Sequence, residues 1–115
     1  MNRSGVILDV IGMMRAVEVS TGLESLDPIS KEILSSIAIA EARNEIPRVT
    51  DIVRMGKLGT APTLFTRVAH LEQHGWIAVG ADTADKRVKR LTLTPKARKA
   101  YSMMSAGALQ ILERH

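Results

Sequence analysis

The chain has 115 residues, a length typical of one domain with a modest hydrophobic core. Hydrophobic residues make up 45% and charged residues 24%, which is a globular composition and excludes a disordered chain. Because there is no cysteine, disulfides, thiolate metal sites and cysteine nucleophiles are excluded, and we expect a reducing compartment, the cytoplasm.

The N-terminus and the hydropathy pattern indicate neither export nor a membrane span. Asp9 interrupts the short apolar run at 6–8, and no small-residue cleavage site follows. No segment approaches the roughly 20 apolar residues that a membrane-spanning helix needs. Aromatic residues make up only 3%, so an aliphatic core and a mainly helical architecture are favoured.

Residues 5–20 are predicted to form a helix, because apolar residues recur there at spacings of three and four. Its apolar face is wide for a lone surface helix, so we expect part of it to meet a second copy of the chain. The residues of this helix predicted at a dimer interface are Val6, Val10, Met13, Met14 and Val17.

Two further helices are predicted before the middle of the chain. Ser30 is expected to cap a helix over 31–42. A shorter helix is expected over 49–55, and the glycines at both ends of 56–59 predict a tight turn.

Residues 60–74 predict a helix with two distinct faces, ended by Gly75. Ala61, Leu64, Val68 and Leu71 share one stripe and should pack on the preceding helices. Thr60 is the expected N-cap. The residues on the opposite side or at the leading end are Thr60, Pro62, Thr63, Thr66, Arg67 and His70.

A basic hairpin and a last helix complete the predicted elements. Short strands are expected over 76–79 and 88–93, joined by a loop rich in basic residues. Pro95 opens a helix over 96–113, whose residues predicted at the dimer interface are Met104, Leu109 and Leu112.

Together these elements predict a mainly α fold with a small β-hairpin (α+β). We expect a single domain over 1–115, in which a winged helix-turn-helix core over 27–94 is flanked by dimerisation segments at 1–24 and 95–115.

Positive charge is concentrated in the second half of the chain. Residues 1–58 carry seven Lys/Arg and eight Asp/Glu, whereas residues 59–115 carry nine and four. A helix followed directly by a basic hairpin is how winged helix-turn-helix proteins bind DNA: the helix enters the major groove, and the hairpin reaches the backbone or the minor groove. We therefore predict a regulator, most simply a repressor, that binds specific double-stranded DNA as a homodimer on a roughly palindromic operator.

The side chains have distinct expected roles in this interface. Arg67 and the threonines can contact base edges, and threonine methyls can contact the thymine methyl. Lys86, Lys89 and Arg90 would neutralise phosphates. Simpler alternatives remain open: Arg67 as the partner of a surface ion pair, and the basic cluster as a solvated face.

Three groups of residues carry a family resemblance. The run 63–77 contains Leu71-Glu72-Gln73-His74-Gly75, the hairpin contains Asp85-Lys86-Arg87, and Leu91-Thr92 precedes the last helix. Together these segments resemble the multiple-antibiotic-resistance regulator (MarR) family over about residues 27–101.

The resemblance implies a dimeric winged-helix transcriptional regulator with a recognition helix over 60–74. It implies that Arg87 enters the minor groove and that Asp85 pairs with Arg87 and holds its orientation. It also implies that the helices at about 5–20 and 96–113 build the dimer. The family usually has two helices after the wing, and this chain has room for one of useful length, so a small-molecule effector is left uncertain.

Other functions have weaker support in the sequence. The main alternative is a winged-helix adaptor that contacts a protein partner without specific DNA binding. His70 and His74 lie four residues apart on a helix but lack a third ligand, so we expect neither a metal nor another cofactor. No nucleophile-base pattern, phosphate-binding glycine loop or carboxylate pair indicates an enzyme.

Overall fold

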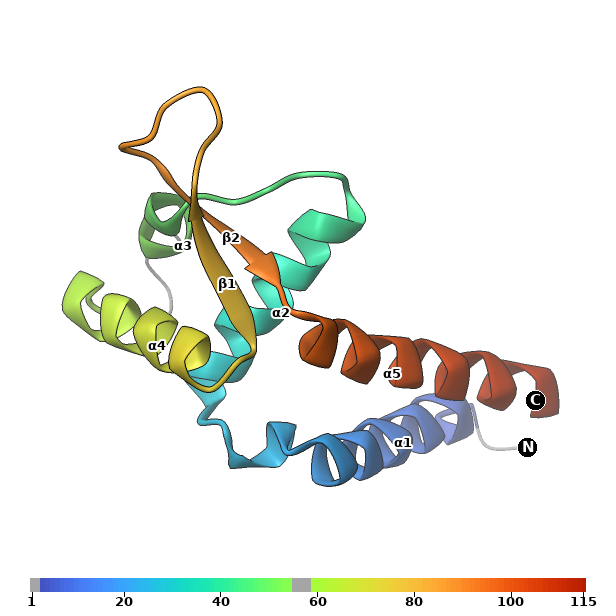
Figure 1. Cartoon of the computed structure of the whole chain (residues 1–115). Coiled ribbons are helices and arrows are strands. Elements are labelled where there is room, and N and C mark those ends of the chain that lie inside the picture. Colours follow the sequence, from blue (N-terminus) through green and yellow to red (C-terminus); the bar gives the residue numbers. More distant parts are fainter. Residues whose placement is uncertain (1–2, 55–58) are drawn as a thin grey trace. The chain divides into compact units, whose positions relative to one another are not determined.

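The computed structural model describes residues 3–54 and 59–115. The predicted helix end at Met55 and most of the predicted turn over 56–59 lie outside these residues. Within them, five α-helices, a short 3-10 helix and two strands follow one another along the chain (Figure 1). In order they are α1 (Gly5–Thr21), η1 (Leu23–Ser25), α2 (Pro28–Ala42), α3 (Val49–Arg54), α4 (Ala61–Gln73), β1 (Ile77–Ala81), β2 (Lys89–Leu93) and α5 (Pro95–Arg114).

The chain divides into two compact units. The central unit spans residues 27–97 and contains α2, α3, α4 and the hairpin; the terminal unit combines residues 1–26 with 98–115. The mainly α fold with one small hairpin is confirmed. The assignment of 1–115 to a single domain stays a prediction.

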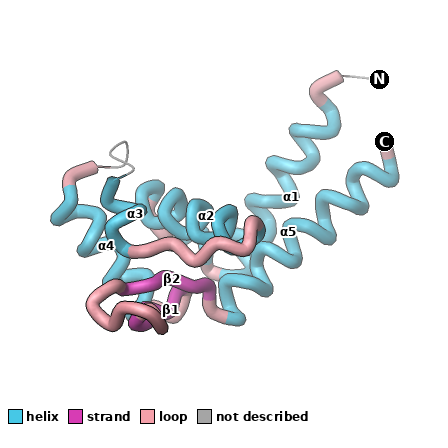
Figure 2. Tube along the Cα trace, turned by 90° about the horizontal axis from the view of Figure 1, so that it is seen from above, coloured by secondary structure: helices cyan, strands magenta, loops and turns pink. Residues whose placement is uncertain are grey.

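The central unit is built on a fully buried aliphatic core. Ile33, Leu34 and Ile37 of α2 pack with Leu64 and Leu71 of α4, as the helical spacing predicts. The two strands are antiparallel, with Ile77 opposite Leu93 at the base of the hairpin. In Figure 2 the hairpin lies to one side of the three helices of this unit, so α4 and the hairpin loop both remain accessible.

Helix α2 begins earlier than predicted. Its N-cap is Asp27 rather than Ser30, because the Asp27 side chain accepts a hydrogen bond from the Ser30 backbone N–H at 2.9 Å. Pro28 occupies the first turn, where its missing N–H costs nothing. Ser30 is instead fully buried, with its hydroxyl 3.2 Å from Asp27 Oδ2.

The segment between α4 and α5 is held by two residues that follow β2. Thr94 donates its hydroxyl hydrogen to the Gly75 carbonyl at 2.6 Å and accepts from the Ala97 N–H, so it joins the end of α4 to the start of α5. Lys96 Nζ lies 4.0 Å from the ring centroid of the buried Trp76 and donates to the His74 carbonyl. These contacts fix the hairpin base against α4.

The terminal unit pairs α1 with the later part of α5. Met13 lies against Gly107, and His115 Nε2 lies 2.8 Å from Asp9 Oδ2. Val17 and Ile111 are buried within this unit. Because Val6, Val10, Met13 and Met104 are half-buried, the stripe predicted for the dimer interface is largely covered by the chain itself.

A different set of apolar side chains remains exposed in the terminal unit. It includes Met14, Leu109 and Leu112, which were predicted at the dimer interface, together with residues that were not. The additional exposed residues are Ile7, Leu8, Ile11, Val19 and Met103. The periodicity of α1 identified an apolar helix, but α5 decided which of its stripes is covered.

We expect Asp27→Ala to lower the free energy of unfolding by about 1–2 kcal/mol, because it removes the cap of α2. Partial burial raises the pKa of Asp27, but the Ser30 N–H and the Arg67 charge outweigh it and leave the pKa below 3.8. The contribution of the carboxylate is therefore complete above pH 3.8 and is lost as the pH falls through the lower native pKa. Urea denaturation at pH 7 and pH 3 measures both effects. Asp27→Asn, which keeps an acceptor for the Ser30 N–H, should cost less at pH 7; an equal loss would contradict the capping role.

We expect Gly107→Ala to destabilise the terminal unit relative to Gly12→Ala. A Cβ at Gly107 would lie 2.6 Å from Met13 Cγ, whereas a Cβ at Gly12 meets nothing within 4 Å. Gly12→Ala should therefore gain about 0.5–1 kcal/mol from helix propensity. Gly107→Ala should have the same gain from helix propensity, but overpacking against Met13 should cost about 1–3 kcal/mol and outweigh it. Thermal unfolding of both variants measures the difference, and equal stabilisation would show that Met13 moves aside freely.

Candidate nucleic-acid interface

Helix α4 presents an accessible face opposite its buried stripe. Leu64, Val68 and Leu71 are buried, as predicted, and Thr60 caps the helix through its side chain. The prediction was wrong for Ala61, which lies in the first turn of α4 and is exposed. Pro62 stands in the first turn. The accessible face carries Ala61, Pro62, Phe65, Thr66, Ala69 and His70 as exposed residues, with Thr63 half-buried.

The threonine hydroxyls of this face are engaged within the helix. Thr66 Oγ1 donates to the Pro62 carbonyl at 2.9 Å. The hydroxyls of Thr60 and Thr63 share a hydrogen bond of 3.0 Å. The predicted residues are therefore brought together on one face, but their hydroxyl groups are satisfied largely by neighbours.

Arg67 lies beside α2 rather than at the centre of the accessible face. Its Nε is 2.9 Å from Asp27 Oδ2, and its side chain is 34% exposed. The pair is close by distance, although the buried Nε–H makes no hydrogen bond of good geometry. The structure thus contains the ion pair that the sequence left open as the alternative to a base contact. We therefore assign Arg67 to the positioning of α4.

The wing, which we define as β1, β2 and the loop over 82–88, carries the Asp85–Arg87 pair that the family resemblance implied. Arg87 Nε lies 3.2 Å from Asp85 Oδ1, while the Arg87 side chain is 91% exposed. Hydrogen bonds from the Arg87 side chain and backbone hold the pKa of Asp85 below its ordinary value, so this carboxylate is charged at neutral pH. The pair fixes an exposed guanidinium at the tip of the wing.

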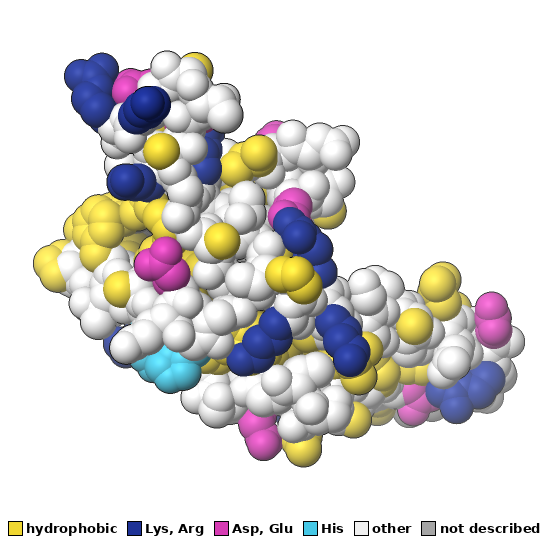
Figure 3. Space-filling model, in the orientation of Figure 1, with side chains coloured by type: hydrophobic (Ala, Val, Ile, Leu, Met, Phe, Trp, Pro, Cys, Tyr) yellow, Lys and Arg dark blue, Asp and Glu magenta, His cyan; other side chains and the backbone are white. Residues whose placement is uncertain are grey.

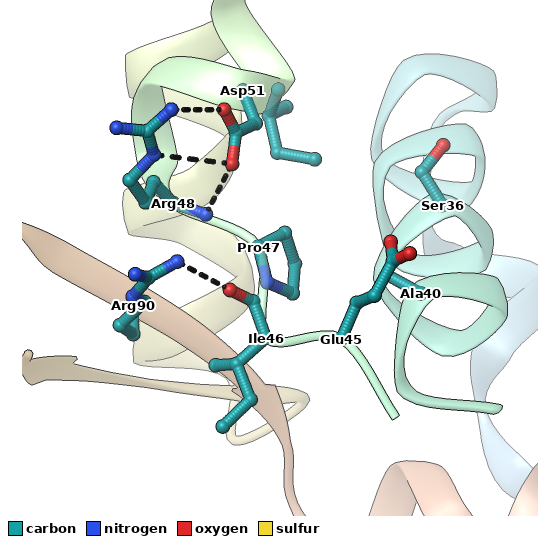
Figure 4. Close-up of a pocket in the computed structure, with 9 residues that line it drawn as sticks. Ser36, Ala40, Glu45, Ile46, Pro47, Arg48, Asp51 and Arg90 are labelled. Carbon is teal, nitrogen blue, oxygen red and sulfur yellow. Dashed lines mark hydrogen bonds and ion pairs between the residues drawn. The ribbon is translucent and has the colours of Figure 1, made fainter. Parts of the chain in front are cut away.

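The other basic side chains of the wing differ in whether they are exposed or held by other groups of the protein. Lys86 and Lys89 are exposed. Arg90, in contrast, is held by Asp82, with Nε 2.9 Å from Oδ1. Its Nη1 also donates to the Ile46 carbonyl at 2.7 Å (Figure 4). In Figure 3 blue basic side chains gather over the hairpin loop, which is where a polyanion would meet them first.

A hollow lies between α3, α4 and the wing, and sequence reasoning did not predict it. It has a volume of about 600 Å³ and is lined by Arg54, Phe65, Val79 and Arg87, among others. Phe65 is 49% exposed, although it is large and apolar. The sequence indicated this exposure, because Phe65 lies next to Thr66 and off the helical stripe of Leu64, Val68 and Leu71.

A second hollow, of about 650 Å³, lies beside the segment that follows α2. The two arginines of its lining are already paired, because Arg48 binds Asp51 at 3.1 Å and Arg90 binds the Ile46 carbonyl (Figure 4). The Arg48 backbone and side chain hold the pKa of Asp51 below its ordinary value. These polar groups support the turn into α3.

His70 and His74 stack at the end of α4. Their ring centroids are 4.0 Å apart, and His74 Nδ1 lies 2.9 Å from the His70 carbonyl. Among the described residues no group of three His, Cys, Asp or Glu side chains is placed to hold a metal ion. Over the same residues, no helix is both long and apolar enough to cross a membrane.

Comparison with known proteins identifies the fold. The sequence matches no protein-family model and no curated protein. Among solved structures, transcriptional regulator Tm0710 from Thermotoga maritima aligns with 95% of this chain and 71% of its own chain, at 20% identity and a TM-score of 0.69. A MarR-like transcriptional regulator from the same organism, tm0816, aligns with 99% of this chain and 80% of its own, at 14% identity and a TM-score of 0.66. The chain has the winged-helix fold of MarR-like transcriptional regulators.

The MarR-like fold includes a protein seen on DNA. A MepR mutant from S. aureus, bound to an oligodeoxyribonucleotide, aligns with 99% of this chain and 80% of its own, at 16% identity and a TM-score of 0.63. The resemblance predicted from residues 63–77 and 85–94 is confirmed for the fold.

Proposed function

We propose that this MarR-like protein is a transcriptional regulator that binds specific double-stranded DNA, most simply as a repressor that occupies its promoter. The observation that carries the proposal is the exposed face of α4 beside a wing whose Arg87 is 91% exposed, both within one compact unit. A helix in the major groove and an arginine in the minor groove are the two contacts that this arrangement supplies. The DNA-bound MepR structure of the same fold supports it.

The residues divide into three roles in the proposed complex. The exposed part of α4, with Thr60, Pro62, Thr63 and Thr66, faces the base edges. Lys86, Lys89 and His70 contact phosphates, and Arg87, oriented by Asp85, enters the minor groove. Arg67 and Arg90 act indirectly, since each is held by an aspartate and fixes the position of its element.

We propose that the protein acts as a homodimer through the terminal unit. Exposed apolar side chains on α1 and α5 give this unit a surface that a second copy can cover, and Ile7, Leu8 and Leu109 are each more than half exposed. A dimer with two-fold symmetry would bind two half-sites about one helical turn apart, so the operator should be roughly palindromic. Such a protein works where the chromosome is, which for a bacterial regulator is the cytoplasm.

Catalysis is not part of the proposal. The solved structures named above are of transcriptional regulators, and we propose neither a cofactor nor a metal for this chain. No small-molecule effector is proposed either.

Fluorescence anisotropy across a salt series tests the proposal. A duplex selected from a random library should bind far more tightly than a scrambled duplex of equal length and composition. Affinity for both should fall steeply with salt, because phosphate contacts release counterions. Weak binding of every duplex, even at low salt, would overturn the proposal and favour an adaptor that binds another protein.

A further inference from the structure

We infer that α4 recognises thymine methyl groups, so that its operator carries A·T pairs where the helix meets the major groove. This inference rests on the proposed DNA-binding function and specifies what that interface reads. Four sets of observations on α4 and the wing lead to it.

The first is that α4 lacks a free cation for guanine. Guanine offers two acceptors in the major groove, and its commonest specific contact is a bidentate Arg or Lys. Arg67 is the one Arg or Lys between Ala61 and Gln73. Its Nε is buried and lies 2.9 Å from the Asp27 carboxylate, so it is committed to α2.

The second is that two of the three threonine hydroxyl donors of the face form hydrogen bonds within the protein. Thr66 Oγ1 donates to the Pro62 carbonyl at 2.9 Å, and one hydroxyl of the Thr60–Thr63 pair donates to the other. The part of Thr66 left for an outside contact is therefore its Cγ2 methyl. A methyl group makes apolar contact and offers guanine no hydrogen bond.

The third is that the rest of the leading face is apolar. Ala61, Pro62, Phe65 and Ala69 are all exposed, and Phe65 is large enough to make one of the main contacts. Alanine, the threonine methyl and phenylalanine are the groups that contact the C5-methyl of thymine. Exposing them to water has no stabilising effect on the free protein, whereas burying them against thymine methyls would favour binding.

The polar residues at the C-terminal end of α4 lie too far along the helix to replace these contacts. Glu72 and Gln73 are exposed, but Gln73 is about 16 Å along the axis from Pro62. Base edges are contacted by the N-terminal residues of a recognition helix, which here are the threonines and apolar residues described above. His70 contacts a phosphate in the proposed complex. Gln73, if it did reach a base, would favour adenine.

The wing supplies the fourth observation. Its Arg87 guanidinium is paired with Asp85, and the Arg87 side chain is almost fully exposed. An arginine inserted into the minor groove gains most where that groove is narrow, as it is in A-tracts. Both contacts of the interface therefore select A·T-rich DNA.

Base analogues test the inference directly. The selected duplex is made with deoxyuridine in place of every thymidine, which removes the C5-methyl groups and keeps every hydrogen-bonding group. Anisotropy should show affinity falling by about tenfold or more across two half-sites. A duplex with 7-deazaguanine in place of guanine, which removes the N7 acceptor, should bind like the unmodified one.

Two variants of Thr66 separate the methyl from the hydroxyl. Thr66→Ser keeps the hydroxyl and loses the methyl, so it should weaken binding about threefold to fivefold and reduce the effect of uracil. Thr66→Val keeps a methyl and loses the hydroxyl, so it should bind like the wild type. Circular dichroism and thermal unfolding confirm that both variants fold, as expected at an exposed position.

The outcomes distinguish this inference from the function on which it rests. Equal binding of the thymine and uracil duplexes would overturn methyl recognition while leaving specific DNA binding intact. A loss of affinity with 7-deazaguanine alone would also overturn it, because the protein would then recognise the N7 acceptor of guanine. A loss in Thr66→Val alone would overturn it as well, because the hydroxyl and not the methyl would then make the contact. Failure to bind any duplex would overturn the proposed function and this inference together.

Discussion

Replacing Arg87 with glutamate should weaken binding to the selected duplex by about 100-fold, with the folded domain unchanged. The Arg87 side chain is 91% exposed and pairs with Asp85, so its removal takes nothing from the buried core. The new carboxylate would face the DNA backbone, where like charges repel. Anisotropy measures the affinity, and thermal unfolding should give the wild-type midpoint within a degree or two.

Milder changes at the same pair give a graded series. Arg87→Ala removes the charge without reversing it and should lose about 30-fold. Asp85→Asn leaves the guanidinium in place but removes the charge that orients it, so the loss should be smaller, about threefold to tenfold. This order is what an oriented minor-groove arginine predicts.

A matched control separates the wing from bulk charge. Arg43→Glu makes the same change in net charge at an exposed position at the end of α2, outside the proposed interface. It should lower affinity only slightly, and the effect should vanish in moderate salt. If Arg87→Glu binds as tightly as Arg43→Glu, the assignment of the wing to DNA is wrong.

The second large effect concerns the terminal unit. Ile11→Glu combined with Met14→Glu should convert the proposed dimer into a folded monomer. Both side chains are about 40% exposed on α1, so charges there are tolerated in one chain but would be buried unpaired between two. Sedimentation velocity measures the mass, and circular dichroism measures the helix content.

The monomer should also lose affinity for the palindromic operator by about 100-fold or more, because it engages one half-site instead of two. Ala16→Glu is the control: it places one carboxylate at an exposed position of α1 away from Ile11 and Met14, and it should stay dimeric. A double variant that remains a dimer with full affinity would show that this face of α1 does not form the interface.

The same variants test which stripe of α1 meets a second chain. Helical spacing predicted Val6, Val10, Met13, Met14 and Val17 as the residues of α1 that meet a second chain. In the structure Val17 is buried and Met13 lies against Gly107, whereas Met14 is exposed. A helix that is apolar on two sides cannot show by its sequence which side its own chain will cover.

The position of the proposed site along the chain was predictable, and the state of its side chains was not. The buried stripe of α4, the cap at Thr60 and the Asp85–Arg87 spacing are local features, and the structure has all three. The partner of Arg67 is Asp27, forty residues earlier, which only the packing of α4 on α2 brings within 2.9 Å.

The sequence by itself determined the elements of this protein: periodicity set the helices, alternation and glycine set the hairpin, and an uneven charge distribution marked the wing. The tertiary structure decided which cations remain available to DNA. Arg67 and Arg90 are captured by Asp27 and Asp82, while Arg87 extends into solvent. The physical reason is that a long charged side chain reaches several ångströms from its own helix or strand, so its partner depends on the element packed opposite and not on its neighbours in sequence.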